Sequence, residues 1–217
     1  MRILPNNFIT EIRLIFNQFY LFFLLYIVFL ITGGILQLFY SQRDILLWFN
    51  RMHTPQLNLL FKYITYFGDG IFAVIVALLF LFVNYRYTIL LIIAFSTGGI
   101  LSQVLKYYID TPRPVLSMGT TSALNLVPGV EVLLHNSFPS GHTITAFTLF
   151  LLLSVIVKKS HFQLLFFTIA LLVALSRVYL LLHFFVDIYF GSMIGIIIVL
   201  VYILLVRRIK FFGKINI

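Results

Sequence analysis

Long runs of apolar residues, separated by short polar links, dominate this sequence. A bilayer span needs about 20 predominantly apolar residues, and six runs come close enough to that length to be interpreted as transmembrane helices. They cover residues 20–40, 71–83, 89–106, 141–157, 162–182 and 184–206. The second run is the shortest, and a start nearer Tyr66 would lengthen it. The pattern predicts an all-α, polytopic membrane protein with six transmembrane helices.

The segment between the first two runs has a different pattern. Residues 41–67 mix apolar clusters with charged and polar positions, which is typical of one or two amphipathic helices lying along the membrane interface. The links 84–87 and 158–161 are short enough to be turns between antiparallel helices, whereas 107–139 is a long connection. Because there is no internal repeat, we expect a single domain over residues 1–217.

Composition agrees with this pattern and excludes other classes of protein. Hydrophobic types make up 62% of the chain, charged types 10%, and the mean hydropathy is +1.09. A soluble domain has about 45–50% apolar and about 25% charged residues. An ordinary soluble domain, a disordered tail and a disulfide-rich secreted module are therefore excluded. The chain has no cysteine, so it forms no disulfide and has no cysteine nucleophile.

The excess of basic residues indicates the orientation of the chain. There are 15 Lys and Arg against 6 Asp and Glu, but no basic stripe interleaved with stacking aromatics, so we expect no nucleic-acid partner. Cytoplasmic loops carry the excess of Lys and Arg. We therefore place both termini in the cytoplasm and the protein in the cell inner membrane. The basic residues on the inner side are then Arg2, Arg13, Arg86, Lys158, Lys159, Arg207, Arg208, Lys210 and Lys214.

The ionisable residues predicted near the outer ends of the later spans form an unusual set. They are Lys106, Arg113, His142, Arg177, His183 and Asp187, with Ser140 and Gly141 beside them. Ionisable side chains near lipid are costly and indicate function or a specific partner. Some have simpler explanations, such as a snorkelling helix end for Lys106 and a structural contact for the His183–Asp187 pair. Their occurrence together on one side favours a common site.

These residue types suit phosphoryl transfer. Arg113 and Arg177 offer planar, bidentate donors for phosphate oxygens, and Lys106 offers a point charge. Ser140 is a natural N-cap for the helix that follows, and the free N–H groups of its first turn form a seat for an anion. Gly141 lets the backbone approach the ligand closely.

Two histidines would supply the chemistry. His183 would be the nucleophile, and Asp187, four residues later on the same helix face, would fix its tautomer. His142 would be the general acid for the leaving group. No pair of carboxylates and no His-x3-His spacing suggests a metal site, and we expect no cofactor.

Three motifs make the chain similar to a known family. KYYIDTPRP at 106–114, PSGH at 139–142 and SRVYLLLHFFVD at 176–187 match, in order, the Lys-x6-Arg-Pro, Pro-Ser-Gly-His and Ser-Arg-x5-His-x3-Asp signature of the PAP2 (type 2 phosphatidic acid phosphatase) superfamily. The sequence resembles this superfamily over 106–187. The six apolar runs and the segment Gly68-Asp69-Gly70 extend the likeness over most of the chain.

The resemblance implies a metal-independent membrane lipid phosphatase. His142 would protonate the leaving group, and His183 would form a phosphohistidine with Asp187 as its partner. In bacterial members the site faces the periplasm. The implied substrate is a lipid phosphate or diphosphate, such as phosphatidic acid, phosphatidylglycerol phosphate, undecaprenyl diphosphate or a lipid A phosphate, and no obligate protein partner is implied. The implied phosphate-binding residues are Lys106, Arg113, Ser140, Gly141 and Arg177.

Other functions stay open at this point. The same pocket could pass the phosphoryl group to a lipid hydroxyl instead of water, which would make the protein a phosphotransferase. Vanadate haloperoxidases resemble the same signature, but they are soluble. A further alternative is a non-enzymatic membrane protein whose outer charges bind an anion. The loop 115–138 would shape the mouth of the site, with His135 and Asn136 either touching a headgroup or packing within the loop.

Overall fold

The computed structural model describes residues 8–119 and 124–209, and within them it contains helices and no β-strand. The predicted all-α fold is confirmed. In chain order the elements are α1 (Phe8–Gln18), α2 (Tyr20–Phe39), α3 (Gln42–Arg51), α4 (Pro55–Ile64), the 3₁₀ turn η1 (Thr65–Gly68), α5 (Gly70–Leu79), the 3₁₀ turn η2 (Phe80–Phe82), α6 (Tyr85–Ile109), α7 (Pro114–Met118), α8 (Gly141–Val157), α9 (Ser160–Tyr179) and α10 (Phe185–Arg208).

Each of the six predicted spans contains a helix, namely α2, α5, α6, α8, α9 and α10. By length and composition, four segments could each cross a membrane: Tyr20–Phe39, Tyr85–Met118, Ser160–Tyr179 and Phe185–Arg208. Pro55–Gly68 and Gly70–Phe82, bent by 58°, would add a fifth as one broken span, and α8 is a shorter apolar helix of 17 residues. The chain is a multi-pass membrane protein, and the span count of six stays a prediction.

The predicted amphipathic stretch folds as two capped helices. Ser41 begins α3 with a capping box: its Oγ accepts from the Asp44 amide at 3.2 Å, and the Asp44 carboxylate accepts from the Ser41 amide at 3.3 Å. Thr54 begins α4 by accepting from the Leu57 amide at 3.2 Å, with Pro55 at the first helical position. These caps satisfy amides that have no partner inside the helix. That α3 and α4 lie along a membrane interface stays a prediction.

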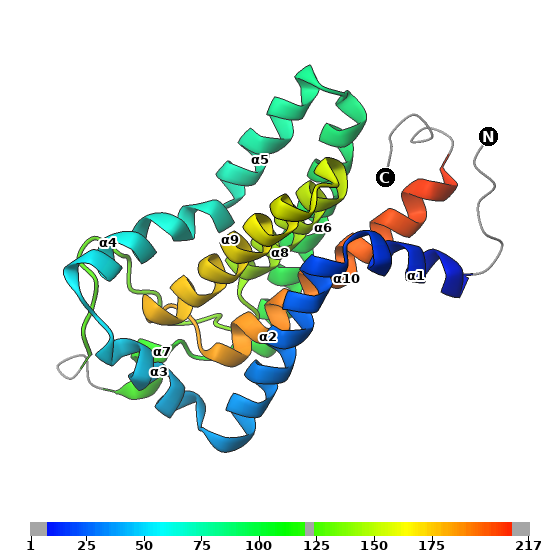
Figure 1. Cartoon of the computed structure of the whole chain (residues 1–217). Helices are drawn as coiled ribbons and strands as arrows, with labels where there is room; N and C mark the ends of the chain where they lie inside the picture. Colours follow the sequence, from blue (N-terminus) through cyan, green and yellow to red (C-terminus); the bar gives the residue numbers. More distant parts are fainter. Residues whose placement is uncertain (1–7, 120–123, 210–217) are drawn as a thin grey trace.

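The helices run between two ends of a bundle (Figure 1). α1, the end of α10 and the turn between α5 and α6 lie at one end, whereas α3, α4 and α7 lie at the other. Arg208 Nη2 lies 3.8 Å from Glu11 Oε2, which joins the last turn of α10 to α1. Several basic residues that the sequence predicts on the cytoplasmic side of the membrane therefore belong to elements that lie together at one end of the bundle. Three others, Arg2, Lys210 and Lys214, lie outside the described residues.

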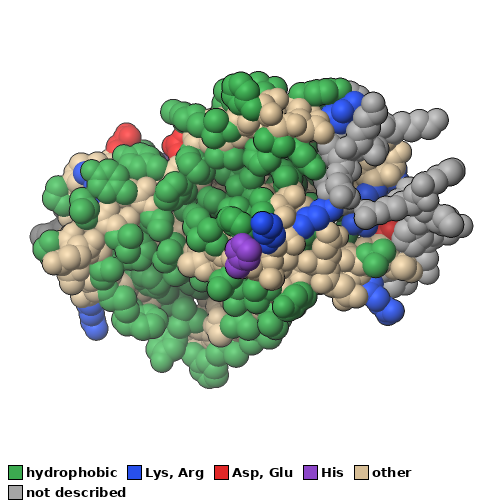
Figure 2. All heavy atoms as spheres, turned by 45° about the horizontal axis from the view of Figure 1, so that its top comes forward, with side chains coloured by type: hydrophobic (Ala, Val, Ile, Leu, Met, Phe, Trp, Pro, Cys, Tyr) green, Lys and Arg blue, Asp and Glu red, His purple; other side chains and the backbone are tan. Residues whose placement is uncertain are grey.

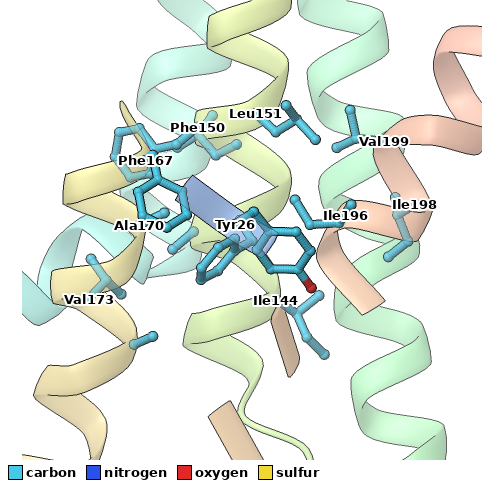
Figure 3. Packing of buried hydrophobic residues seen from close by; sticks show 14 of the residues in the cluster. Tyr26, Ile144, Phe150, Leu151, Phe167, Ala170, Val173, Ile196, Ile198 and Val199 are labelled. Atoms are coloured by element: carbon cyan, nitrogen blue, oxygen red, sulfur yellow. The ribbon is translucent and has the colours of Figure 1, made fainter. Parts of the chain in front are cut away.

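α8 is the most deeply buried helix and organises the core. Every residue from Thr143 to Val155 is buried, as expected of a helix that is apolar on all sides. Side chains from α2, α9 and α10 pack around it, including Tyr26, Phe167 and Val199 (Figure 3). The start of α8, where one predicted motif lies, is therefore held in a fixed position by its neighbours.

Glycines let neighbouring helices approach α8 closely. A Cβ at Gly195 of α10 would lie 2.9 Å from the Ile144 carbonyl oxygen, and one at Gly191 would lie 3.0 Å from the Ser140 carbonyl oxygen. A Cβ at Gly98 of α6 would lie 2.9 Å from the Ile144 side chain. Small residues are common at helix contacts in lipid, where close packing drives association. α10 and α6 therefore pack directly against the first turns of α8.

Hydrophobic side chains dominate the outer face shown in Figure 2, and acidic side chains are few. Leu38 and Phe82 are examples of large apolar side chains that are strongly exposed, at 82% and 90%. Such a surface is suited to lipid acyl chains, because a membrane protein keeps its backbone polar groups paired inside helices and presents apolar side chains outward.

Replacing Gly195 by Ala should destabilise the protein by about 1–3 kcal/mol, because the added methyl group overpacks against the backbone of α8. The matched control is Gly99→Ala in α6, where a Cβ meets nothing within 4 Å. This change should leave stability unchanged or raise it by up to about 1 kcal/mol, since alanine is the better helix former. Thermal unfolding in one detergent measures both, and equal melting temperatures would contradict the close contact.

Candidate active site

A pocket of about 320 Å³ lies where the ends of α6 and α9 meet the start of α8. Ser140 and Asp187 are buried beside it, and the Ser140 amide donates to the Asp187 carbonyl at 3.2 Å. Three motifs that are far apart in the sequence thus meet in one place. Six of the eight predicted site residues line the pocket: Lys106, Arg113, Gly141, His142, Arg177 and His183.

The first motif reaches the pocket through the end of α6. Lys106 lies in the last turn of this helix, which ends at Asp110 in the left-handed conformation, with φ of 30°. Arg113 then begins α7, and its side chain returns to the same pocket. The sharp turn after α6 therefore lets one short segment contribute two cations.

Main-chain carbonyls hold the guanidinium of Arg113. Nε donates to the His135 carbonyl at 2.7 Å, Nη1 to the Leu182 carbonyl at 3.0 Å and Nη2 to the Asn136 carbonyl at 3.4 Å. The side chain is 5% exposed. Because a guanidinium carries five N–H donors, two remain to bind a ligand while the planar group is kept in place. His135 and Asn136 therefore contribute to the site through their backbones.

Arg177 lies in the last turn of α9 and is buried. Its Nη1 donates to Thr65 Oγ1 of η1 at 2.8 Å, and its Nε has no hydrogen-bond partner within the described part of the chain. Its carbonyl accepts from the Leu182 amide at 2.9 Å and from the His183 amide at 3.1 Å. These two hydrogen bonds fold the turn after α9 back against the Arg177 backbone and bring His183 into the pocket beside it.

His183 and Asp187 form a buried pair, exposed by only 1% and 2%. His183 Nδ1 lies 3.3 Å from Asp187 Oδ2, and the same oxygen accepts from Ser137 Oγ at 2.5 Å and from the Phe184 amide at 2.9 Å. His183 lies in the loop before α10, whereas Asp187 lies in the first helical turn of α10. The two residues therefore do not share a helix face. Asp187 caps α10 and orients His183 with one carboxylate oxygen.

The surroundings of His183 keep its ring neutral. Burial lowers the pKa of His183 well below its ordinary value, and the positive charges of Arg177, Arg113 and Lys106 lower it further. Because Nδ1 faces Asp187, Nε2 lies on the other side of the ring, and the ring lines the pocket. A neutral imidazole of this kind is available as a nucleophile.

His142 is the second residue of α8 and has a carboxylate neighbour of its own. Its Nε2 lies 3.8 Å from Asp69 Oδ2, while Asp69 Oδ1 accepts from the Ile71 amide at 2.8 Å and caps α5. A Cβ at Gly68 would lie 2.8 Å from the His142 carbonyl oxygen. Only a glycine there allows the corner between η1 and α5 to pack this closely on His142.

The start of α8 differs in one respect from the prediction. Ser140 occupies the N-cap position, but its Oγ accepts from Thr143 Oγ1 at 3.0 Å and forms no capping bond with a backbone amide. Its side chain is fully buried and is not among those that line the pocket. Gly141 does line it, so the open face of the helix start lies at Gly141 rather than at the Ser140 hydroxyl.

Four residues of the site were not predicted from the sequence: Thr65, Asp69, Ser102 and Ser137. Thr65 and Ser137 hold Arg177 and Asp187, and single hydroxyl residues of this kind give no signal in a sequence. Asp69 did give one, an acidic residue between two glycines before an apolar run. Across residues 8–119 and 124–209, no group of three or more His, Asp or Glu residues is arranged to hold a metal ion.

Comparison with known proteins gives one family and two related structures. The model of the PAP2 superfamily matches residues 87–211. The crystal structure of Aquifex aeolicus LpxE is 28% identical and has a TM-score of 0.66, with 74% of this chain and 93% of that chain covered. A transmembrane PAP2-type phosphatidylglycerolphosphate phosphatase from Bacillus subtilis is 27% identical and has a TM-score of 0.67, with 89% and 99% covered. No curated protein matches the chain by sequence.

The lowered pKa of His183 predicts how stability changes with pH. Below its ordinary pKa of about 6.5, the unfolded chain binds a proton at this residue and the folded chain does not. Stability should therefore fall with decreasing pH, by about 1 kcal/mol per pH unit from this residue. His183→Asn should show a smaller loss between pH 7 and pH 5, whereas the exposed control His161→Asn should behave as the wild type. Equal losses in all three proteins would contradict the prediction.

Proposed function

The chain belongs to the PAP2 superfamily, and we propose that it hydrolyses a lipid phosphate or diphosphate through a phosphohistidine on His183. The observation that carries this proposal is a single pocket that combines Lys106, Arg113 and Arg177 with two imidazoles. A nucleophile, a proton donor and a charge cradle are the parts that a metal-free phosphoryl transfer requires.

In the first step, His183 Nε2 attacks the phosphorus atom and the bond from phosphorus to the leaving oxygen breaks. The Nδ1–H group donates to Asp187, which lies 3.3 Å away, so the positive charge that develops on the ring is stabilised. His142 gives its proton to the leaving oxygen, which departs as a lipid hydroxyl or, from a diphosphate, as a lipid monophosphate.

Three cations and a helix start bind the phosphoryl oxygens in this step. Arg113, Arg177 and Lys106 all line the pocket, and Arg113 keeps two N–H donors that main-chain carbonyls leave unused. The amides at the start of α8, next to Gly141, add a positive dipole end. Fixed donors that already point at the developing charge need no reorganisation during the reaction.

In the second step, water attacks the phosphohistidine. His142, now neutral, takes a proton from the water, the new P–O bond forms and the P–N bond to His183 breaks. Inorganic phosphate leaves, and both histidines return to their starting protonation states. Asp69, 3.8 Å from His142 Nε2, is the carboxylate that faces this ring.

The membrane setting supports a lipid substrate. Apolar side chains cover the exterior of the helices around the pocket, so a lipid can reach the site by moving sideways in the bilayer. One of the two similar structures is a phosphatidylglycerolphosphate phosphatase. Phosphatidylglycerol phosphate, phosphatidic acid, undecaprenyl diphosphate and lipid A phosphate are the substrates to test, with the site on the periplasmic face of the inner membrane.

The purified protein should release inorganic phosphate from at least one of these four lipids in detergent, and His183→Ala should reduce the rate by about a thousandfold or more. In the first turnover, His142→Ala should release the leaving group about 10²–10⁴-fold more slowly from the lipid but with a much smaller loss from p-nitrophenyl phosphate, whose leaving group needs no proton; the first turnover separates this step from the hydrolysis in which His142 also acts. His161→Ala is the matched control and should keep the wild-type rate. Equal losses on both substrates would remove His142 from the role of general acid, and transfer of phosphate to another lipid without release would identify a phosphotransferase.

Two simpler measurements test the remaining parts of the proposal. EDTA should leave the rate unchanged, because the proposed mechanism uses no metal. A reporter that is active only in the periplasm should be inactive when fused after residue 217, since we place the C-terminus in the cytoplasm. Inhibition by EDTA that a metal ion reverses, or an active reporter, would contradict the mechanism or the orientation.

A further inference from the structure

Ser102 is a buried polar residue that the proposed mechanism has not used. It lies in α6, is 2% exposed, and its Oγ has no hydrogen-bond partner among the described residues. Leaving a buried hydroxyl unpaired costs free energy, so a group in this position needs an explanation. Ser102 also lines the pocket that holds the two histidines and the three cations.

The position of the hydroxyl relative to the start of α8 is informative. A Cβ built on Gly141 would lie 3.3 Å from Ser102 Oγ and 3.9 Å from Lys106 Nζ. Residues four apart on a helix face the same side, so Ser102 and Lys106 lie one turn apart and both approach the space above Gly141. The hydroxyl, the ammonium and the helix start therefore face a common position.

We propose that Ser102 is a substrate-binding residue whose Oγ–H donates a hydrogen bond to a phosphoryl oxygen seated above Gly141. This inference rests on the proposed phosphatase function. Hydrogen bonds to a charged oxygen are roughly twice as strong as neutral ones, so the ligand would supply the partner that the protein does not. It also gives a reason for glycine at position 141, because a side chain there would occupy the seat.

Thr88 gives a matched comparison within the same helix. Its Oγ1 is also buried without a partner in the described structure, but Thr88 does not line the pocket. An unpaired hydroxyl in α6 is therefore not by itself a sign of a ligand. What distinguishes Ser102 is its place beside Lys106 and Gly141.

The test compares Ser102→Ala and Thr88→Val with the wild type, each as the full chain in the same detergent. Ser102→Ala should lower kcat/KM for phosphate release by about 10–100-fold and raise the inhibition constants of inorganic phosphate and vanadate in the same direction. Its melting temperature without ligand should be unchanged or higher, because no hydrogen bond within the protein is lost. Thr88→Val should keep the wild-type kcat/KM and inhibition constants.

Several results would overturn the inference. One is a kcat/KM and a phosphate inhibition constant for Ser102→Ala within twofold of the wild type. Another is a Ser102→Ala protein that melts several degrees lower or does not fold, which would assign the hydroxyl to the fold.

A wild type that releases no phosphate from any of the four lipids would instead overturn the proposed function. Thermal stabilisation by inorganic phosphate would then decide about Ser102 separately. Its loss in Ser102→Ala would support the hydroxyl as an anion ligand, and its retention would refute this role.

Discussion

The structure depends on one electrostatic constraint, two buried guanidinium groups and a half-buried ammonium in an apolar bundle with very little compensating negative charge. Within residues 8–119 and 124–209, no carboxylate lies within 4.0 Å of Lys106, Arg113 or Arg177. Neutral oxygens accept from the two guanidinium groups, main-chain carbonyls at Arg113 and the Thr65 hydroxyl at Arg177, whereas Arg177 Nε has no partner among the described residues. Neutral acceptors leave the net positive charge unchanged, and an uncompensated charge in a medium of low dielectric raises the free energy of the folded state. A phosphate dianion would offset this cost, and this is the physical reason for proposing the binding site where the three cations meet.

The geometry of the site follows from close packing around α8 and from two short turns. Glycines at 68 and 191 bring the η1 corner and α10 against the first turn of this helix, and so place Asp69 and Asp187 near the two histidines. The Arg177 carbonyl accepts from the His183 amide, which makes a proposed phosphate-binding residue and the proposed nucleophile parts of one folded unit. Reactive groups must be held to within about 0.5 Å to work together, and rigid helix contacts of this kind provide that.

Much of this arrangement could be predicted from the sequence because periodicity and motif spacing report on it directly. The helical class, the helix in each apolar run and the meeting of the three motifs all follow from residues read in order. The capping role expected of the Ser140 side chain did not, because Thr143 competes for its oxygen. The helix face expected for His183 and Asp187 was also wrong, since His183 precedes α10 and Asp187 caps the start of that helix. Which of several hydrogen bonds forms at such a position depends on residues that are close in space, and the spacing of residues in the sequence does not give this information.

The contacts that hold the Arg113 guanidinium do not depend on which side chains the contacting residues carry. Its guanidinium is bound by the carbonyl oxygens of His135, Asn136 and Leu182, and a carbonyl is present whatever side chain the residue carries. Side chains at positions 135, 136 and 182 can therefore be exchanged without removing the carbonyl oxygens that hold Arg113. Under the proposed function, the side chains that would meet a headgroup could change while the groups proposed for cleavage stay in place.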